Sequence, residues 1–213
     1  MKFFNFNPIG HICLLCHEST QKKLALCNDC EKTLPFTEKI QNPDFNKTII
    51  LFDYLFPVDK LITRLKFQHH LINASLFGQL LSNKISQLYH NQDMPSLLIP
   101  VPLHIKRLRE RGFNQALEIA KPISKQLKIP IDKKSCYRIR HTAAQSGLSQ
   151  QDRLKNLKNA FDMKKPLTTK HIALIDDVMT TGQTLKELAN LLRKNGVETI
   201  DVWCCAKTPR SFD

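Results

Sequence analysis

Residues 171–184 constrain the fold of this 213-residue chain more than any other stretch. The apolar residues 172–175 predict a short buried strand, and two carboxylates, Asp176 and Asp177, follow that strand at once. A short loop then leads into a helical pattern that begins at Gln183. A buried strand that turns tightly into a helix is the repeating unit of parallel α/β sheets, so this segment predicts an α/β fold.

The loop and the first helical turn have the composition of an anion-binding site. The residues expected to surround the anion are Val178, Met179, Thr180, Thr181, Gly182, Gln183 and Thr184. Backbone N–H groups and the dipole at a helix N-terminus favour a phosphate, and a glycine lets the backbone approach it without a Cβ. Asp176 and Asp177 can accept hydrogen bonds from the vicinal hydroxyls of a ribose 5-phosphate. The segment therefore predicts a sugar-phosphate pocket; the alternative is a threonine-capped turn with exposed aspartates that bind nothing.

Positive charge is concentrated in one part of the chain. The sequence has 32 Lys and Arg against 19 Asp and Glu, a net charge of +13. Residues 104–170 alone contain 17 basic and 5 acidic residues, which is a net charge of +12. Such a concentrated block indicates a polyanionic partner, either nucleic acid or pyrophosphate, whereas the alternative is a set of solvated helix faces.

Two segments of this basic block carry candidate anion-binding residues. The first reads PVPLHIKRLRERGFNQ over residues 100–115, and the second begins at residue 140. Arginine suits phosphate because its planar guanidinium presents rigid, bidentate donors. The second segment lacks apolar periodicity, so we expect a loop that orders around a ligand; an exposed linker is the alternative. The candidates are Pro100, Val101, Arg107, Arg109, Arg111, Arg140 and Arg153.

The N-terminal region contains two C-x2-C pairs separated by ten residues. The four cysteines are Cys13, Cys16, Cys27 and Cys30. Four thiolates at this spacing can close a tetrahedron around a structural zinc ion, and disulfides or free thiols are the alternative. Three further cysteines, Cys136, Cys204 and Cys205, lie in apparent strands, which favours a reducing compartment. We expect a four-cysteine zinc finger over residues 1–35 and an α/β domain over residues 36–213.

Strand and helix patterns alternate along the rest of the chain. Strands are expected at residues 48–55, 97–101, 135–139, 172–175 and 199–206. Helices are expected at residues 57–67, 71–89, 114–128, 183–194 and from Asp152 onward. Pro122 should kink the helix at 114–128 or shift its start, and Gly196 should end the last helix. This alternation predicts a parallel sheet that binds ligands at the carboxyl ends of its strands.

Several classes of protein are excluded or disfavoured. The sequence contains neither G-x-x-x-x-G-K-[ST] nor G-x-G-x-x-G, the signatures of two other phosphate-binding folds. No stretch approaches the roughly 18 uncharged apolar residues that a membrane span needs. The N-terminal apolar region has no small-residue cleavage site, so we expect no signal peptide. Peripheral membrane contact through Phe3, Phe4 and Phe6 stays open.

These motifs together resemble known protein families. The sequence DDVMTTGQT, residues 176–184, resembles the signature loop of type I phosphoribosyltransferases, which bind 5-phosphoribosyl 1-pyrophosphate (PRPP) with magnesium. Four features together resemble the ComF family, also called ComFC or GntX-like: the C-x2-C pairs, PVPLHxxRLRxRGFNQ, RxTxxQxxL from residue 140, and DDVxTTGxT. Members of that family are competence proteins needed for natural transformation.

The resemblance implies a fold and a set of roles. It implies a type I phosphoribosyltransferase-like parallel sheet flanked by helices, with a small N-terminal zinc finger. In such a site Asp176 and Asp177 would hold the ribose as catalytic residues, magnesium would span the pyrophosphate, and arginines would face the leaving group. Asp177 is the only candidate general base by position.

The resemblance also implies partners and a location. The first hypothesis is a protein that handles incoming single-stranded DNA through a pocket for PRPP or a ribose phosphate. The second is an active phosphoribosyltransferase with an unknown acceptor, and the third is a zinc-stabilised scaffold for other DNA-uptake proteins at the inner membrane. Such a protein would work in the cytoplasm or at the inner face of the membrane. Aromatic residues inside the basic block are few, and Phe36 and Phe67 lie outside it, so base stacking is expected to be modest beside electrostatic attraction.

Overall fold

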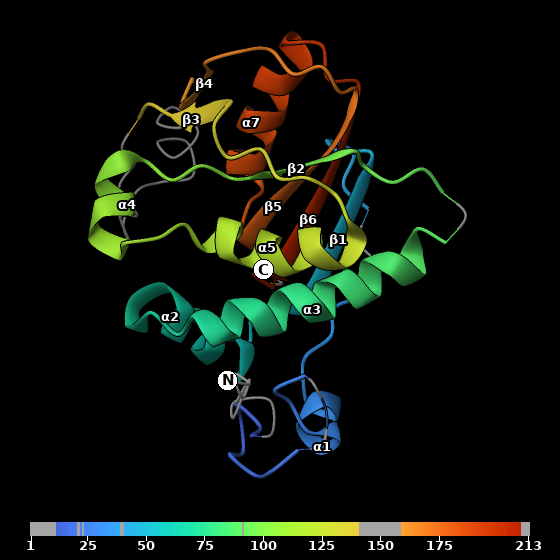
Figure 1. Cartoon of the computed structure of the whole chain (residues 1–213), viewed down its shortest axis with the longest axis vertical. Helices are drawn as coiled ribbons and strands as arrows, with labels where there is room; N and C mark the ends of the chain where they lie inside the picture. The colour runs from blue at the N-terminus through green and yellow to red at the C-terminus, as the bar shows by residue number, and fades with distance from the viewer. Residues whose placement is uncertain are drawn as a thin grey trace, which may run out of the picture.

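A four-stranded parallel sheet forms the centre of the computed structural model, which describes residues 12–20, 22, 24–38, 41–90, 92–140 and 159–209. Its strands, in the spatial order β1–β6–β5–β2, are β1 (Lys47–Asp53), β6 (Thr199–Lys207), β5 (His171–Met179) and β2 (Leu97–Pro100). The described helices are α1 (Asn28–Lys32), α2 (Val58–Gln68), α3 (Leu71–Leu88), α4 (Ile105–Arg111), α5 (Gln115–Leu127) and α7 (Gln183–Lys194). Figure 1 shows α3 and α5 on one side of the sheet and α7 on the other. This is the parallel α/β fold that the sequence predicts.

Each face of the sheet is buried in its own hydrophobic cluster. Successive side chains of a strand point to opposite faces, and Ala173 and Ile175 of β5 accordingly pack with α3 and α5, whereas Ile172 and Leu174 pack with α7. The apolar stripe of α7, Leu185, Leu188, Ala189 and Leu192, covers that second face. Because both faces are covered, the central strands are continuously apolar instead of alternating.

Helix α5 contains Pro122 and yet starts where the sequence predicts. Asn114 caps the helix by accepting a hydrogen bond from the backbone N–H of Leu117, and the helix runs through Pro122 to Leu127. The proline ring lies against Gly78 of α3: a Cβ on that glycine would be 2.2 Å from Pro122 Cγ. Pro122 therefore neither ends the helix nor shifts its start, and Gly78 permits the close approach of α3 and α5.

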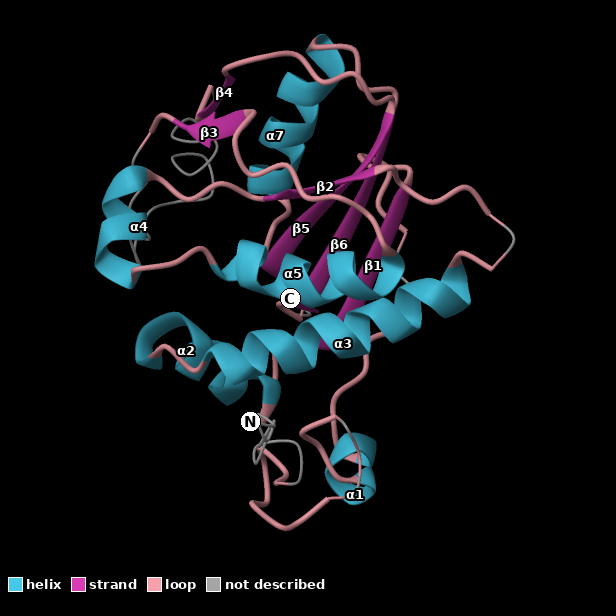
Figure 2. Cartoon of the chain, in the orientation of Figure 1, coloured by secondary structure: helices cyan, strands magenta, loops and turns pink. Residues whose placement is uncertain are grey.

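Three local predictions differ from the structure. The predicted strand at 172–175 is too short, because β5 continues through the two aspartates to Met179 in regular pairing with β6. No helix was predicted for the arginine-rich segment after β2, but it forms the helix α4, capped by His104 and ended by Gly112 at φ 72°. Strand β4 (Phe161–Met163) was not predicted; it pairs antiparallel with β3 (Cys136–Arg138) in a separate two-stranded sheet (Figure 2).

Two further expectations concern parts of the chain away from the sheet. The helix expected from Asp152 lies outside the described residues. Within the residues that the structure describes, no helix combines the length and the apolar character needed to cross a bilayer.

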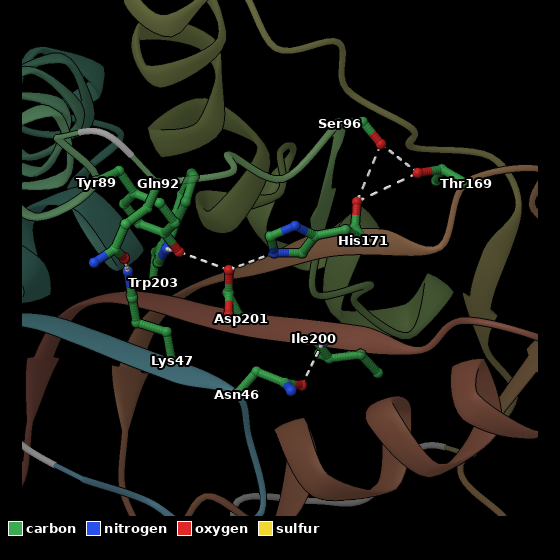
Figure 3. Close-up of polar contacts among 10 residues, drawn as sticks. All are labelled: Asn46, Lys47, Tyr89, Gln92, Ser96, Thr169, His171, Ile200, Asp201 and Trp203. Atoms are coloured by element: carbon green, nitrogen blue, oxygen red, sulfur yellow. Dashed lines mark hydrogen bonds and ion pairs between the residues drawn. The ribbon is translucent and has the colours of Figure 1, made fainter.

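A buried polar network ties the amino-terminal half of β6 to its neighbours (Figure 3). Asp201, only 2% exposed, accepts a hydrogen bond from the Tyr89 hydroxyl at 2.6 Å and lies 2.7 Å from His171 Nε2. The Trp203 indole N–H donates to the same tyrosine oxygen at 3.3 Å. Burial, together with the hydrogen bond to Asp201, raises the pKa of Tyr89, so its hydroxyl stays a donor. This network fixes α3 against β5 and β6.

Removal of the Asp201 carboxylate should destabilise the protein strongly. Asp201→Ala leaves the buried Tyr89 hydroxyl and the partly buried His171 ring without their partner, and we expect a loss of about 2–4 kcal/mol in the free energy of unfolding. Urea unfolding measures the loss. Glu198→Ala is the matched control, since the Glu198–Lys170 pair is exposed and should contribute less than about 1 kcal/mol. Equal losses for the two variants would contradict this account of the network.

Candidate functional site

The two aspartates at the carboxyl end of β5 face opposite sides of the sheet. The register with β6 is regular from His171 to Met179, so neighbouring side chains alternate. Asp177, 9% exposed, turns toward α2, where its Oδ2 lies 3.0 Å from Lys66 Nζ. Asp176 shares the side of Ile172 and Leu174, which is the side covered by α7. The acidic pair therefore presents Asp177, held in an ion pair, and Asp176, whose Oδ1 accepts a hydrogen bond from the N–H of Asp177 at 2.9 Å and whose nearby charges include Arg138.

Asp176 carries an unusual proton affinity. Burial raises the pKa of Asp176 from 3.8 to about 7, and the neighbouring charge of Asp177 adds to the effect. Lys66 and Arg138 oppose the rise. Near neutral pH this carboxyl is balanced between its two protonation states, so a ligand that donates hydrogen bonds to it favours the ionised form.

The turn between β5 and α7 has the geometry of an anion site. Gly182 adopts φ 76°, a left-handed conformation that side chains disfavour. Thr180 and Thr181 are exposed, Gly182 at the N-cap position makes no side-chain hydrogen bond, and the N–H of Gln183 donates to Thr181 Oγ1 at 3.4 Å. The first turn of this helix contains no acidic residue. Its backbone N–H groups and dipole therefore favour a negatively charged ligand beside Thr181.

The end of β2 lies beside β5 at Ile175, the residue before Asp176. The N–H of Val101 donates to the carbonyl oxygen of Ile175 at 2.9 Å, and Pro100 is paired with Ile175 in the ladder. Asn114 holds the same segment by donating from Nδ2 to the Val101 carbonyl at 3.0 Å. Residues 100–101 are consequently neighbours of Asp176.

Two guanidinium groups belong to this part of the structure. Arg138 lies close enough to Asp176 and to Arg107 for both charges to change its pKa. Burial lowers the pKa of Arg138, the charge of Arg107 lowers it further, and the charge of Asp176 opposes the decrease. Burial also lowers the pKa of Arg107, and the nearby Arg111 adds to that shift. Partly buried cations that repel one another favour the binding of an anion between them. Arg138, on β3, and Lys66, on α2, are thus members of the site that the sequence prediction missed.

The other predicted anion-binding residues lie in different places. Arg111 donates from Nη1 to Gln115 Oε1 at 3.1 Å and faces Phe67, Arg109 is exposed on α4, and Arg140 is exposed after β3. Arg153 lies outside the described residues. The segment from Val178 to Thr184, with Pro100, Val101, Arg107 and the acidic pair, is gathered at one edge of the sheet.

A cavity of about 750 Å³ adjoins this edge between β2, α4, α5 and β3. Its lining includes Pro100, which pairs with Ile175 next to Asp176, and Arg138, together with His104, Phe113, Asn114 and Tyr137. The cavity therefore gives a ligand at the acidic pair room to extend beyond the sheet.

The four N-terminal cysteines form a cluster that can hold a metal ion. Their Sγ atoms all lie within 4.8 Å of one another, and Cys16 Sγ is 3.8 Å from Cys27 Sγ. Burial acts to raise the pKa of Cys13, but hydrogen bonds from the N–H groups of Cys16 and Cys27 dominate and lower it to about 6. Burial and the neighbouring thiols raise the pKa of Cys30. A cation among these sulfur atoms would stabilise the thiolates that otherwise repel one another.

The fold and the edge site define a class of protein. A parallel sheet in which an acidic strand end turns through Thr-Thr-Gly into a helix is the arrangement of a phosphoribosyltransferase-type domain. In agreement, the family model described as "Phosphoribosyl transferase domain" matches residues 114–211.

Similar proteins cover almost the whole chain. It is 36% identical over 228 residues to "Competence protein F" of Haemophilus influenzae, which covers 97% of this chain and 99% of that protein. It is 35% identical to "DNA utilization protein YhgH" of Shigella flexneri, over 94% of this chain and 92% of that one. It is 29% identical to "Competence protein ComFC" of Bacillus subtilis, over 88% of this chain and 73% of that protein. The chain belongs to the competence protein F family, as the sequence motifs predict.

The raised pKa of Asp176 predicts a stability that depends on pH. The Asp176 carboxyl loses its proton near pH 7 in the folded protein but near pH 3.8 in the unfolded chain. Ionisation of Asp176 therefore lowers the free energy of unfolding progressively between these two pH values, and the full loss is present above pH 7. Asp176→Asn should therefore raise the free energy of unfolding by about 1–4 kcal/mol at pH 8 and by less than about 1 kcal/mol at pH 4. Thermal unfolding at both pH values measures the difference. The exposed Asp93→Asn serves as control, and a gain independent of pH would contradict the assignment.

Proposed function

We propose that this protein binds PRPP or a related ribose phosphate at the β5–α7 edge and handles single-stranded DNA during DNA uptake. The observation that carries the proposal is the pairing of opposite chemistries at one edge. Asp176 offers an acceptor for ribose hydroxyls, and Arg138, Arg107 and the α7 N-terminus offer donors for phosphates. The names of the relatives, which refer to competence and DNA utilization, support the DNA part of the proposal.

Magnesium fits the oxygen-rich character of such a site. Carried in with PRPP, the ion would neutralise the pyrophosphate charge and polarise the bond to the ribose. Asp176 is the carboxylate suited to face the ion, because Asp177 already contacts Lys66. The residues of this chain would orient the ribose through Asp176 and hold the pyrophosphate through Arg107 and Arg138.

An active transferase with an unknown acceptor is the second candidate function. The sequence nominates Asp177 as the general base, but its Oδ2 lies 3.0 Å from Lys66 Nζ, so this carboxylate is already engaged in an ion pair. A pKa of about 7 suits Asp176 better for accepting a proton near neutral pH. Pyrophosphate release from PRPP in the presence of bases, amines or nucleic acid tests this candidate, and release that Asp176→Asn abolishes would support it.

Calorimetric titration with PRPP and magnesium tests the pocket. Arg138→Ala should weaken PRPP binding about 10- to 100-fold, because a charge-assisted contact contributes about 1.5–3 kcal/mol. Arg109→Ala is the matched control, since Arg109 is exposed on α4, and its effect should stay below about 3-fold. Equal losses for both variants would show a diffuse charge effect, and an absence of binding by the wild-type protein would refute the pocket.

We also propose that the four-cysteine cluster holds a structural zinc ion. Tetrahedral zinc with bonds of about 2.3 Å places its sulfur ligands about 3.8 Å apart, and the distance between Cys16 Sγ and Cys27 Sγ is 3.8 Å. Zinc binding would then contribute to the folding of the finger proposed over residues 1–35.

Metal analysis tests the finger. The purified protein should carry one zinc ion per chain, and Cys27→Ser should lose it together with the protease resistance of residues 12–34, while the α/β sheet persists. Cys136→Ser, which changes a cysteine outside the cluster, should keep the metal. Full zinc content in Cys27→Ser, or its loss in both variants, would contradict the assignment.

A further inference from the structure

Helix α2 carries exposed aromatic and basic residues on its outer side. Phe67 is 65% exposed and Phe56, just before the helix, is 76% exposed, the two highest values among the exposed large hydrophobic residues that the structure describes. Lys60 and Arg64, four residues apart, are exposed as well, and residues at this spacing share a helix face. The outer surface of α2 therefore alternates flat apolar rings with cations.

The structure places this surface against the basic block. The Arg111 guanidinium lies 5.3 Å from the centre of the Phe67 ring, and the rings of His69 and Phe113 are 5.5 Å apart. A Cβ at Gly112 would be 3.7 Å from His69 Cε1. Figure 1 shows α2 and α4 at the same end of the molecule. Phe67 is distant from Arg111 in the sequence but adjacent to it in space.

The combined surface is strongly positive. Residues 58–70 contain three Lys or Arg against one Asp, and residues 104–112 contain four against one Glu, which gives a net charge of +5. Lys66 contacts Asp177 and so connects this surface to the acidic pair of the pocket. A surface of this charge with interleaved rings complements a polyanion that carries flat apolar groups.

We infer that Phe56, Lys60, Arg64, Phe67 and Arg111, the α2–α4 face, form a stacking platform for single-stranded nucleic acid. The inference rests on the proposed handling of single-stranded DNA and assigns it a surface. Phosphates would contact the cations, and bases would stack on Phe67 and on the plane of Arg111. Duplex DNA offers no free base faces along its length, so the platform selects single strands. Because the guanidinium covers one side of Phe67, the ring is held as a flat wall instead of a side chain that inserts into lipid.

Two oligonucleotides separate stacking from phosphate binding. Fluorescence anisotropy would compare labelled oligothymidylate with an abasic oligomer of equal length, at one salt concentration. Phe67→Ala should weaken oligothymidylate binding about 10-fold, in the range expected for the loss of one stacked base, and change abasic binding by less than about 2-fold. Phe67→Tyr keeps a ring and should bind like the wild-type protein. Leu88→Ala, at an exposed position at the end of α3, is the control for removal of an exposed apolar side chain, and thermal unfolding confirms that each variant is folded.

The outcomes are distinguishable. Wild-type binding that Phe67→Ala leaves unchanged would overturn the platform and leave the proposed function intact, whereas no binding by the wild-type protein would overturn the DNA part of that function. Equal weakening with both oligomers would show that Phe67 only positions Arg111, which also overturns stacking. Phosphatidylglycerol vesicles test the alternative of a membrane surface. If Phe67→Ala loses the vesicle binding of the wild-type protein but binds both oligonucleotides as the wild-type protein does, the face contacts a membrane and the inference is overturned.

Discussion

The regular parallel pairing of β5 with β6 and β2 is the interaction on which the rest of the structure depends. Because the ladder continues through Asp176 to Met179, the two carboxylates are rigidly placed on opposite faces at the edge of the sheet. One meets Lys66 of α2, and the other lies within reach of the charge of Arg138. A frayed strand end at this point would leave the same residues without a defined geometry toward any ligand.

The edge of the sheet is electrostatically unfavourable without a ligand. Asp176 is half-buried beside a second carboxylate, and Arg107 and Arg138 lie near each other in a partly buried position. The proposed ribose phosphate would relieve both conflicts, since its hydroxyls would donate to the carboxylate and its phosphates would accept from the guanidinium groups. Such a site lowers stability in exchange for binding, which is the usual relation between functional sites and fold stability. The buried network around Asp201 stabilises the same sheet through satisfied hydrogen bonds.

The sequence predicted what depends on local pattern and missed what depends on distant partners. Helix α7 was predicted with its observed bounds, because its apolar stripe and the flanking glycines are local signals. The length of β5 was underestimated, since the polar aspartates end the apolar run, although backbone pairing with β6 continues regardless of side chain. Helix α4 was missed because its four basic residues conceal the periodicity. Lys66 and Arg138 were missed because their significance arises only from the approach of α2 and β3 to the strand edge; Lys66 lies four residues after the buried Ile62, a weak local hint.

The central claim is that a sugar-linked phosphate lies at the N-terminus of α7 between the acidic pair and the guanidinium groups. A crystal structure of the protein soaked with PRPP and magnesium tests it most directly. The account predicts phosphate density beside the N–H groups that follow Gly182, with the ribose hydroxyls toward Asp176. An empty turn, or a ligand bound elsewhere at saturating concentration, would contradict it.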